Sequence, residues 1–382
     1  MPSSRLGVKL AQLPHGVLAE LAAQLCSDSA ALQAAADECI AAHNPLPLWA
    51  VERVLLSPDL MPHILGPLKA EDAAAAAVCS QWSAGWKATN EPRRRLKHVP
   101  CELPPEIMAE SYDLSMAGSP DGRLVVRAGS NMLILDRSML VLDRLAEDDH
   151  NYHGPMVASD DSIYLCTDDA PLTLYCSAYD GTPIVQYQLE GHGFYSPVLA
   201  PGGLLFCILW DSEDPKGLNE IIALDAQTLQ LRHRFGAGLL NHASHLAVVA
   251  DELYVCDAAN DRLQVFSLTG EHRRSVKGEW KSPDQLCFAK DRLYLIEGVP
   301  KEDDEDADGD GDTSIPWPGQ GRRILVLSLL GDILQVVTHP TEPMAEFDQI
   351  CCFDDKLLAT YNVYIKSGAG GYHSGVLALQ GL

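Results

Sequence analysis

Basic residues are scarce in this sequence. The 382 residues include 28 Lys and Arg against 53 Asp and Glu, which gives a formal net charge of −25 at pH 7. A protein this acidic repels a phosphate backbone and an anionic membrane surface. The composition therefore predicts no nucleic-acid partner and no membrane partner.

Paired cysteines and long apolar runs are also missing. The eleven cysteines form no C-x-x-C pair that would suggest zinc binding or thiol exchange. Residues 1–25 lack the basic and then apolar order of a signal peptide, and no stretch approaches the ~18 consecutive apolar residues of a membrane helix. We expect a protein of a reducing compartment, in the cytoplasm, the nucleus or both.

Sequence motifs of several enzyme classes are absent as well. The chain has no G-x-S-x-G nucleophile turn, no P-loop and no G-x-G-x-x-G dinucleotide fingerprint. Its glycine-rich stretch, Gly368 to Gly371, stands between two predicted strands, where a hairpin loop is expected. The sequence predicts no catalytic residues and no cofactor, apart from the calcium alternative below.

What the chain does have is two differently composed parts. Residues 10–86 are rich in Ala and Leu with apolar residues spaced for helices, whereas from Val99 onward short β-branched and aromatic runs alternate with Gly, Asp, Asn and Pro. The charged, proline-containing stretch at 91–100 is expected to be the linker between the two domains. We predict a multidomain α plus all-β protein: a helical extension at 1–50, a helical domain at 51–98 and a β domain at 99–382.

The β domain is repetitive. Six times an acidic or glycine-containing turn precedes a short apolar strand, and a second strand follows it. These strands begin at Leu124, Ile163, Leu204, Leu253, Leu293 and Leu357. Units of roughly 40 to 50 residues are typical of four-stranded propeller blades. The repeats predict a six-bladed β-propeller with an acidic insertion at 301–321, closed by a strand from within Leu96 to Leu103.

The fourth repeat carries the first family resemblance. Leu253 to Phe266, followed by Thr269-Gly270-Glu271, resembles the NHL repeat, in which a strand is followed by Asp, two small residues, Asn, x and Arg. The resemblance implies an NHL-like propeller. From the residues themselves, Asp257 and Asn260 are expected to bond the turn backbone, and Arg262 to pair with such an acid.

The helical domain carries the second family resemblance. The run from Leu56 to Leu68, the acidic pair Glu71-Asp72 and the ending Val78-Cys79-Ser80-Gln81-Trp82 resemble the F-box. The resemblance implies an adaptor that holds the Skp-type subunit of a cullin ubiquitin ligase. It implies contacts through Leu56, Pro58, Asp59, Leu60, Ile64, Leu65, Leu68, Val78, Cys79 and Trp82. The alternative is a helical cap that packs only against the propeller.

Helical spacing supports two short amphipathic helices in this region. Leu60, Ile64 and Leu68 fall on one apolar stripe, and we expect Asp59 to cap a helix with Pro62 in its first turn. Val78 and Trp82 belong to a second stripe.

The acidic insertion offers a calcium alternative. Its residues Asp304, Asp306, Asp308 and Asp312 reproduce part of the spacing of calcium loops. The twelfth position is Ile315 rather than the bidentate Glu, so a solvated loop is favoured over a metal site.

The propeller also has candidate contact residues. Aromatic residues expected on strand-connecting loops could anchor a protein substrate. They are Tyr152, Phe194, Tyr195, Trp210, Trp280 and Trp317. Candidates for the mouth of the central channel are His153, His192, His242, His245 and Asp284, and the histidines are interpreted as satisfied loop residues.

These features together predict a substrate-recognition adaptor of a Skp/cullin/F-box ubiquitin ligase, a non-catalytic subunit. Residues before Cys101 are balanced in charge, so the acidic excess belongs to the propeller and a basic protein segment is the expected substrate. One alternative is a calcium-dependent hydrolase or lyase similar to the lactonase propellers, with a helical cap. Another is an interaction scaffold without a ubiquitin role.

Overall fold

The computed structural model divides into two compact units, Met1–Arg95 and Leu96–Gln380. It describes residues 57, 59–65, 68, 80–88, 94–104, 107, 114–129, 131–145, 152–167, 172–211, 218–298, 321–365 and 371–381. Among these residues, no helix is both long enough and apolar enough to span a membrane.

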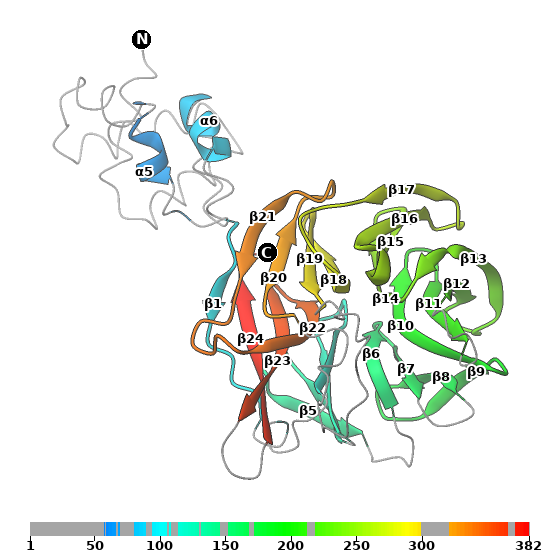
Figure 1. Ribbon diagram of the computed structural model, residues 1–382. Helices are drawn as coiled ribbons and strands as arrows, with labels where there is room; N and C mark the ends of the chain where they lie inside the picture. The colour runs from blue at the N-terminus through cyan, green and yellow to red at the C-terminus, as the bar shows by residue number, and fades with distance from the viewer. Residues whose placement is uncertain are drawn as a thin grey trace, which may run out of the picture. The chain divides into compact units, whose positions relative to one another are not determined.

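The first unit contains α5 (Met61–Leu65) and α6 (Ser80–Ala88) (Figure 1). The backbone N–H groups of Leu60 and Met61 donate to the carbonyl of Ser57, so the helical turn starts two residues before the predicted cap, Asp59. Pro62 is the second residue of α5, where its missing N–H costs little, as predicted.

The two helices pack through a neighbouring stripe of α5 rather than the predicted one. Met61 and Leu65 are 3% and 0% exposed, whereas Leu60 is 40% exposed and Ile64 is half-buried. Gly85 of α6 permits this contact, because a Cβ there would lie 2.2 Å from Cγ of Met61. The predicted stripe is therefore only partly covered within the described helices.

The second unit is a six-bladed β-propeller. Its strands form six four-stranded antiparallel sheets, each called a blade below (Figure 1). The innermost strands β2, β6, β10, β14, β18 and β22 contact one another in that order, and β22 contacts β2 again. This closed ring confirms the predicted architecture and leaves only short outer edges.

The strands follow chain order from the axis outward. Blade one comprises β2 (Leu114–Gly118), β3 (Leu124–Ala128), β4 (Asn131–Leu135) and β5 (Val141–Leu145). Blade two comprises β6 (Tyr152–Ala158), β7 (Ser162–Thr167), β8 (Thr173–Ala178) and β9 (Pro183–Gln188). Blade three comprises β10 (His192–Ala200), β11 (Leu204–Asp211), β12 (Leu218–Asp225) and β13 (Leu231–Asn241). Blade four comprises β14 (Ala243–Val249), β15 (Glu252–Asp257), β16 (Arg262–Ser267) and β17 (His272–Val276). Blade five comprises β18 (Pro283–Ala289), β19 (Arg292–Glu297), β20 (Ile324–Leu327) and β21 (Ile333–Val337). Blade six comprises β22 (Glu346–Phe353), β23 (Lys356–Ile365) and β24 (Gly371–Gln380), with β1 (Lys97–Val99) as its outer strand.

Strand β1 closes the ring. It pairs antiparallel with β24, with Lys97 opposite Gln380 and Val99 opposite Ala378, so it supplies the outer strand that blade six lacks. This confirms the predicted closing segment. The propeller unit starts at Leu96, which is 5% exposed in the core between blades five and six. The boundary drawn after residue 98 therefore moves to Arg95.

Gln335 fastens the closing strand to blade five. Its Nε2 donates to the carbonyl of Leu96 at 3.0 Å, and the Leu96 N–H donates to its Oε1 at 2.8 Å. We expect Gln335→Ala to lower the free energy of unfolding by about 1–2 kcal/mol, because both backbone groups of Leu96 lose a partner. Thermal unfolding measures the effect. Gln186→Ala, an exposed glutamine on the outermost strand of blade two, is the matched control and should change little.

Blade four has a buried corner at Asp257, which is 0% exposed. Its carboxylate accepts hydrogen bonds from the Asn241 backbone at 2.8 Å, Asn260 Nδ2 at 2.9 Å and Arg262 Nε at 2.6 Å. The pairing with Arg262 is as predicted, but Asn260 bonds the carboxylate instead of the turn backbone.

Blade five repeats this corner. Glu297 ends its second strand and accepts from the backbone of Lys281 at 2.9 Å and from Arg323 Nη2 at 2.8 Å. An acid, an arginine across the strand pair and a backbone N–H from the preceding connection thus tie each of these two blades together.

Candidate functional site in the central channel

The aromatic residues that were predicted to anchor a protein substrate do not share one exposed surface. Phe194 and Tyr195 lie in β10 and Trp210 in β11, not on loops, and Phe194 is buried. Trp210, at 38% exposed, covers Gly193. Trp317 and the side chain of Tyr152 lie outside the described residues.

Trp280 corrects the prediction most clearly. It stands between β17 and β18 and is 1% exposed. Its ring lies between two glycines, since a Cβ would approach it to 1.8 Å from Gly278 and to 2.8 Å from Gly331, whose φ is +95°. Trp280 is therefore a core residue and cannot anchor a partner.

Other predicted site residues lie outside the described part of the chain. They are Leu56, Pro58, Val78 and Cys79 of the F-box-like region, and Asp304, Asp306, Asp308 and Asp312 of the acidic insertion. Within the described residues, no group of three or more His, Cys, Asp or Glu side chains could hold a metal ion.

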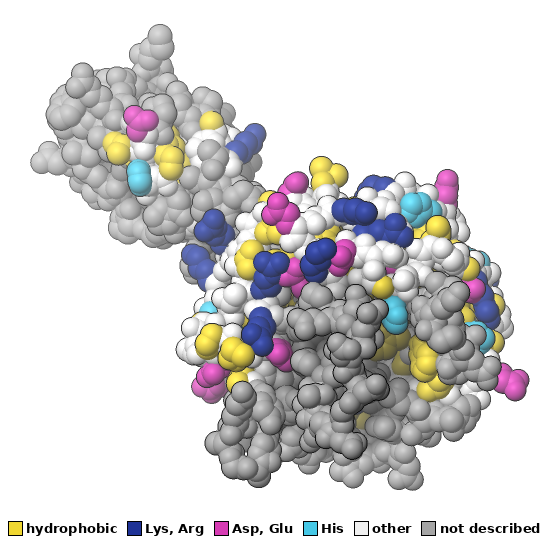
Figure 2. All heavy atoms as spheres, viewed as in Figure 1, with side chains coloured by type: hydrophobic (Ala, Val, Ile, Leu, Met, Phe, Trp, Pro, Cys, Tyr) yellow, Lys and Arg dark blue, Asp and Glu magenta, His cyan; other side chains and the backbone are white. Residues whose placement is uncertain are grey.

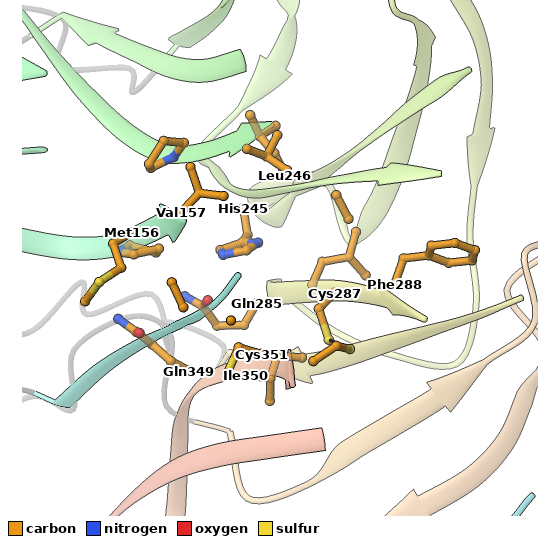
Figure 3. Close-up of a pocket in the computed structure, with 18 of the residues that line it drawn as sticks. Met156, Val157, His245, Leu246, Gln285, Cys287, Phe288, Gln349, Ile350 and Cys351 are labelled. Carbon is orange, nitrogen blue, oxygen red and sulfur yellow. Dashed lines mark hydrogen bonds between the residues drawn. The ribbon is translucent and has the colours of Figure 1, made fainter. Parts of the chain in front are cut away.

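All six innermost strands line a cavity of about 220 Å³ on the propeller axis. Figure 3 shows Met156, His245, Gln285 and Gln349 converging on it from four different strands. Cys287 and Cys352 add an apolar part, with their Sγ atoms 3.3 Å apart. Burial raises the pKa of Cys287 and Cys351, so both thiols stay neutral at physiological pH.

The innermost strands carry β-bulges at or next to the residues that line this cavity. The pairing of the innermost strand with its neighbour shifts register in five blades, whereas β2 and β3 pair regularly. Bulges turn side chains out of the regular pleat. The residues at or beside these shifts are polar in four blades: Ser196, Ser244, Asp284 and Asp348.

The two bulge serines connect adjacent blades. The Leu246 N–H donates to Ser196 Oγ at 3.1 Å, and Ser244 Oγ donates to the carbonyl of Asp284 at 2.8 Å. Their hydroxyl groups therefore serve the fold, which leaves the two aspartates as the charged members of the ring.

Asp284 and Asp348 interact electrostatically with Tyr195. Burial raises the pKa of Asp284 to about 7, and the charge of Asp348 adds to this rise. Burial also raises the pKa of Tyr195, and both carboxylates contribute. Because these residues come from the innermost strands of blades five, six and three, their side chains can interact only around the channel.

Gln285 is the member of this group that lines the cavity. Its side chain is 3% exposed, its Nε2 donates to Asp284 at 3.4 Å, and it lies within hydrogen-bonding reach of the Tyr195 hydroxyl. Its buried Oε1 has no hydrogen-bond partner among the residues that the structure describes, and neither does Nδ1 of His245. Burial lowers the pKa of His245 to about 4, so its ring is neutral at physiological pH.

Sequence reasoning found part of this site. Asp284 and His245 were predicted at the mouth of the channel, whereas Tyr195 was predicted on a loop as a substrate contact. Nδ1 of His192, the first residue of β10, lies 2.8 Å from the carbonyl of Glu190, so this histidine is satisfied as predicted although it lies in a strand. The side chain of His153 lies outside those described. Asp348, Gln285 and Gln349 were missed, although the tetrapeptide Asp-Gln-Leu/Ile-Cys occurs both at 284–287 and at 348–351.

Comparisons with known proteins give only distant likenesses. No protein-family model matches the chain, and no curated protein matches it. The similar solved structures include a computationally designed protein, Ika8 (14% identity, 70% of each chain covered, TM-score 0.41), and a nidogen/laminin complex (12%, 61% of this chain and 82% of that chain, 0.46). BamB from Moraxella catarrhalis is similar at 15% identity, over 71% of this chain and 86% of that chain, with a TM-score of 0.41. The propeller assignment rests on the strand pairing and ring closure described above.

Proposed function

We propose that this chain is a non-catalytic substrate-recognition adaptor of a Skp/cullin/F-box ubiquitin ligase, acting in the cytoplasm or nucleus. In this proposal residues 51–98 dock the Skp-type subunit, and the propeller binds a protein substrate. The observation that carries it is the α5–α6 pair, which fills its own contact with Met61 and Leu65 and keeps Leu60 exposed.

The exposed stripe is what a docking helix requires. A short helix that left no apolar side chain outside its own contact would have nothing to offer a partner. Leu60 and Ile64 coincide with adaptor-binding positions implied by the F-box resemblance, and the half-buried Trp82 of α6 does so too. This arrangement supports docking in preference to a purely structural helical pair.

A six-bladed propeller is consistent with protein binding. In this proposal it raises the effective concentration of substrate lysines near the ligase and supplies no acid, base or nucleophile. No cofactor has a part in this mechanism.

Co-purification with a Skp-type adaptor tests the docking surface. We expect the full chain to retain the adaptor, and Leu60→Asp with Trp82→Ala to weaken binding about 30-fold or more, since buried apolar anchors carry most of the affinity of such contacts. Leu60→Asp alone changes an exposed residue, so it tests the surface without disturbing the helix contact.

His63→Ala, an exposed residue of the same helix, is the control and should bind as the unmodified chain does. Retention of the adaptor by the double variant would contradict the assigned surface. No binding by the unmodified chain would instead favour the scaffold or helical-cap alternatives.

A further inference from the structure

Two cysteine side chains from neighbouring blades are in contact beside the central channel. The Sγ atoms of Cys287, in β18, and Cys352, in β22, are 3.3 Å apart. Both residues line the cavity of about 220 Å³, and both are half-buried. They are 65 residues apart in the chain, so only the folded propeller brings the two thiols together.

The alternation of side chains along the innermost strands explains this contact. Successive side chains of a strand point to opposite faces. In β18, Leu286 packs in the core between blades four and five, whereas Cys287 packs between blades five and six. In β22, Cys351 packs toward blade one, whereas Cys352 packs toward blade five. Because β18 and β22 contact each other, the two thiols are held together by strands of two blades rather than by loops.

The separation of the two sulfurs is compatible with a disulfide bond. Bond formation requires an approach from 3.3 Å to about 2.05 Å, which small rotations about the Cα–Cβ bonds can supply. Burial raises the pKa of Cys287, so this thiol is neutral at rest. Disulfides that form in a reducing compartment are usually transient and redox-sensing. A pair of this kind is therefore expected to rest as two thiols and to respond to an oxidant.

The lining of the cavity narrows the class of oxidant. Figure 2 shows Lys and Arg side chains interspersed with Asp and Glu on the visible face of the propeller. In contrast, the described residues that line the cavity include no Asp, Glu, Lys or Arg. A charged peptide disulfide would lose hydration there without gaining an ionic partner, and the cavity is below the ~300 Å³ of ordinary small-molecule sites. Hydrogen peroxide is neutral and little larger than water, so it can reach the thiols.

We propose that Cys287 and Cys352 form a reversible disulfide that links blades five and six when a hydroperoxide enters the channel. In the first step one thiol loses its proton and attacks a peroxide oxygen, the O–O bond breaks, and a sulfenic acid and water or an alcohol are formed. The second thiol then attacks the sulfenic sulfur, so the S–S bond forms while the S–O bond breaks and water leaves. Each sulfur gives up one electron, and the peroxide takes both.

The link would fasten the ring on its channel side. On the outer side, Gln335 of blade five already bonds Leu96, next to the strand that closes blade six. The disulfide would also close a loop that contains the acidic insertion at 301–321. Closing a long loop restricts the unfolded chain, so the oxidised propeller is expected to be more stable than the reduced one.

Peptide mapping of the full chain tests the proposal. The reduced protein is treated with hydrogen peroxide under native conditions, alkylated with iodoacetamide and digested for mass spectrometry. We expect a peptide pair linked through Cys287 and Cys352, loss of alkylation at both residues and reversal by dithiothreitol. The oxidised chain should unfold at a temperature about 4 °C or more above that of the reduced chain.

Matched variants assign the effect to this pair. Cys352→Ser should lose both the linked peptides and the rise in unfolding temperature. Cys101→Ser changes a half-buried cysteine outside the pair and should keep both. The linked peptides are detected in the unmodified chain, so the test does not depend on the stability of a variant.

Three results would overturn the proposal. The first is a link that joins other cysteines or two chains. The second is oxidation of Cys287 or Cys352 to a sulfinic acid without any link. The third is faster linking by oxidised glutathione than by hydrogen peroxide, which would contradict the class of oxidant. These measurements involve no Skp-type subunit, and the proposal does not depend on the ligase function.

Discussion

Replacing Asp257 with alanine is expected to lower the free energy of unfolding by about 3–5 kcal/mol, the usual cost of breaking a buried charge pair. The carboxylate is 0% exposed and holds Arg262, Asn260 and the backbone N–H of Asn241. Its removal leaves these donors without their acceptor and loosens the corner that joins blade four to the preceding connection. Urea unfolding of the full chain, followed by far-ultraviolet circular dichroism, measures the change.

Asp251→Ala is the matched control, because it removes another acid–arginine pair from the same blade. Asp251 is 76% exposed, and its bond with Arg273 is 2.8 Å long. Exposed pairs contribute about 0–1 kcal/mol. An equal, small loss in both variants would show that the Asp257 corner does not stabilise the blade.

The two corners show what a local pattern can and cannot reveal. Asp257 and Arg262 are five residues apart, so their pairing could be predicted from the sequence. Glu297 and Arg323 make the same contact across 26 residues, because the acidic insertion separates the two strands. Only the pairing of Ile296 with Ile324 brings them together, and nothing local to either residue predicts it.

The blades were predictable for a physical reason. The middle strands, such as Ile324–Leu327, are buried on both faces, so they are short, mainly apolar runs next to turns. The innermost strands were missed because bulges interrupt their alternation and their polar residues face the channel. The residues that form the candidate site therefore lie in the strands with the weakest sequence signal.

Aromatic side chains gave a poor guide to the binding surface. Trp280 was expected at the rim, yet its environment depends on Gly331, 51 residues later in the chain, and on Gly278. Residue type predicts that a tryptophan is large and apolar, but its exposure depends on tertiary packing. The repeated Asp-Gln-Leu/Ile-Cys segment, in contrast, was readable and marks equivalent positions in two blades.

The largest pH-dependent effect is expected at Asp284. Its pKa rises from 3.8 in the unfolded chain to about 7 in the fold, so the folded state binds more protons between these values. The stability that protonated Asp284 contributes is therefore fully present below about pH 4, and it is lost progressively as the pH rises to about 7. The charge of Asp348 contributes to this rise, and Tyr195 and Cys256 also interact electrostatically with Asp284.

Asp284→Asn removes this penalty, because asparagine resembles the protonated carboxyl group in shape and carries no charge. At pH 5 the variant should already be more stable than the unmodified chain by about 1.5–2 kcal/mol, because the carboxyl group of the unfolded chain is ionised there. At pH 8 the variant should be more stable by up to about 4 kcal/mol, since each pKa unit corresponds to about 1.4 kcal/mol. Urea unfolding at a series of pH values from 5 to 8 measures this divergence.

Asp225→Asn provides a control of opposite sign. Hydrogen bonds from Arg232 and Thr228 lower the pKa of Asp225 to about 2, so its contribution is present above pH 4 and is lost only in strong acid. That variant should be slightly less stable than the unmodified chain throughout pH 5–8, with no divergence. If Asp284→Asn behaved in the same way, ionisation of Asp284 would not destabilise the folded propeller, which would contradict the raised pKa of this carboxyl group.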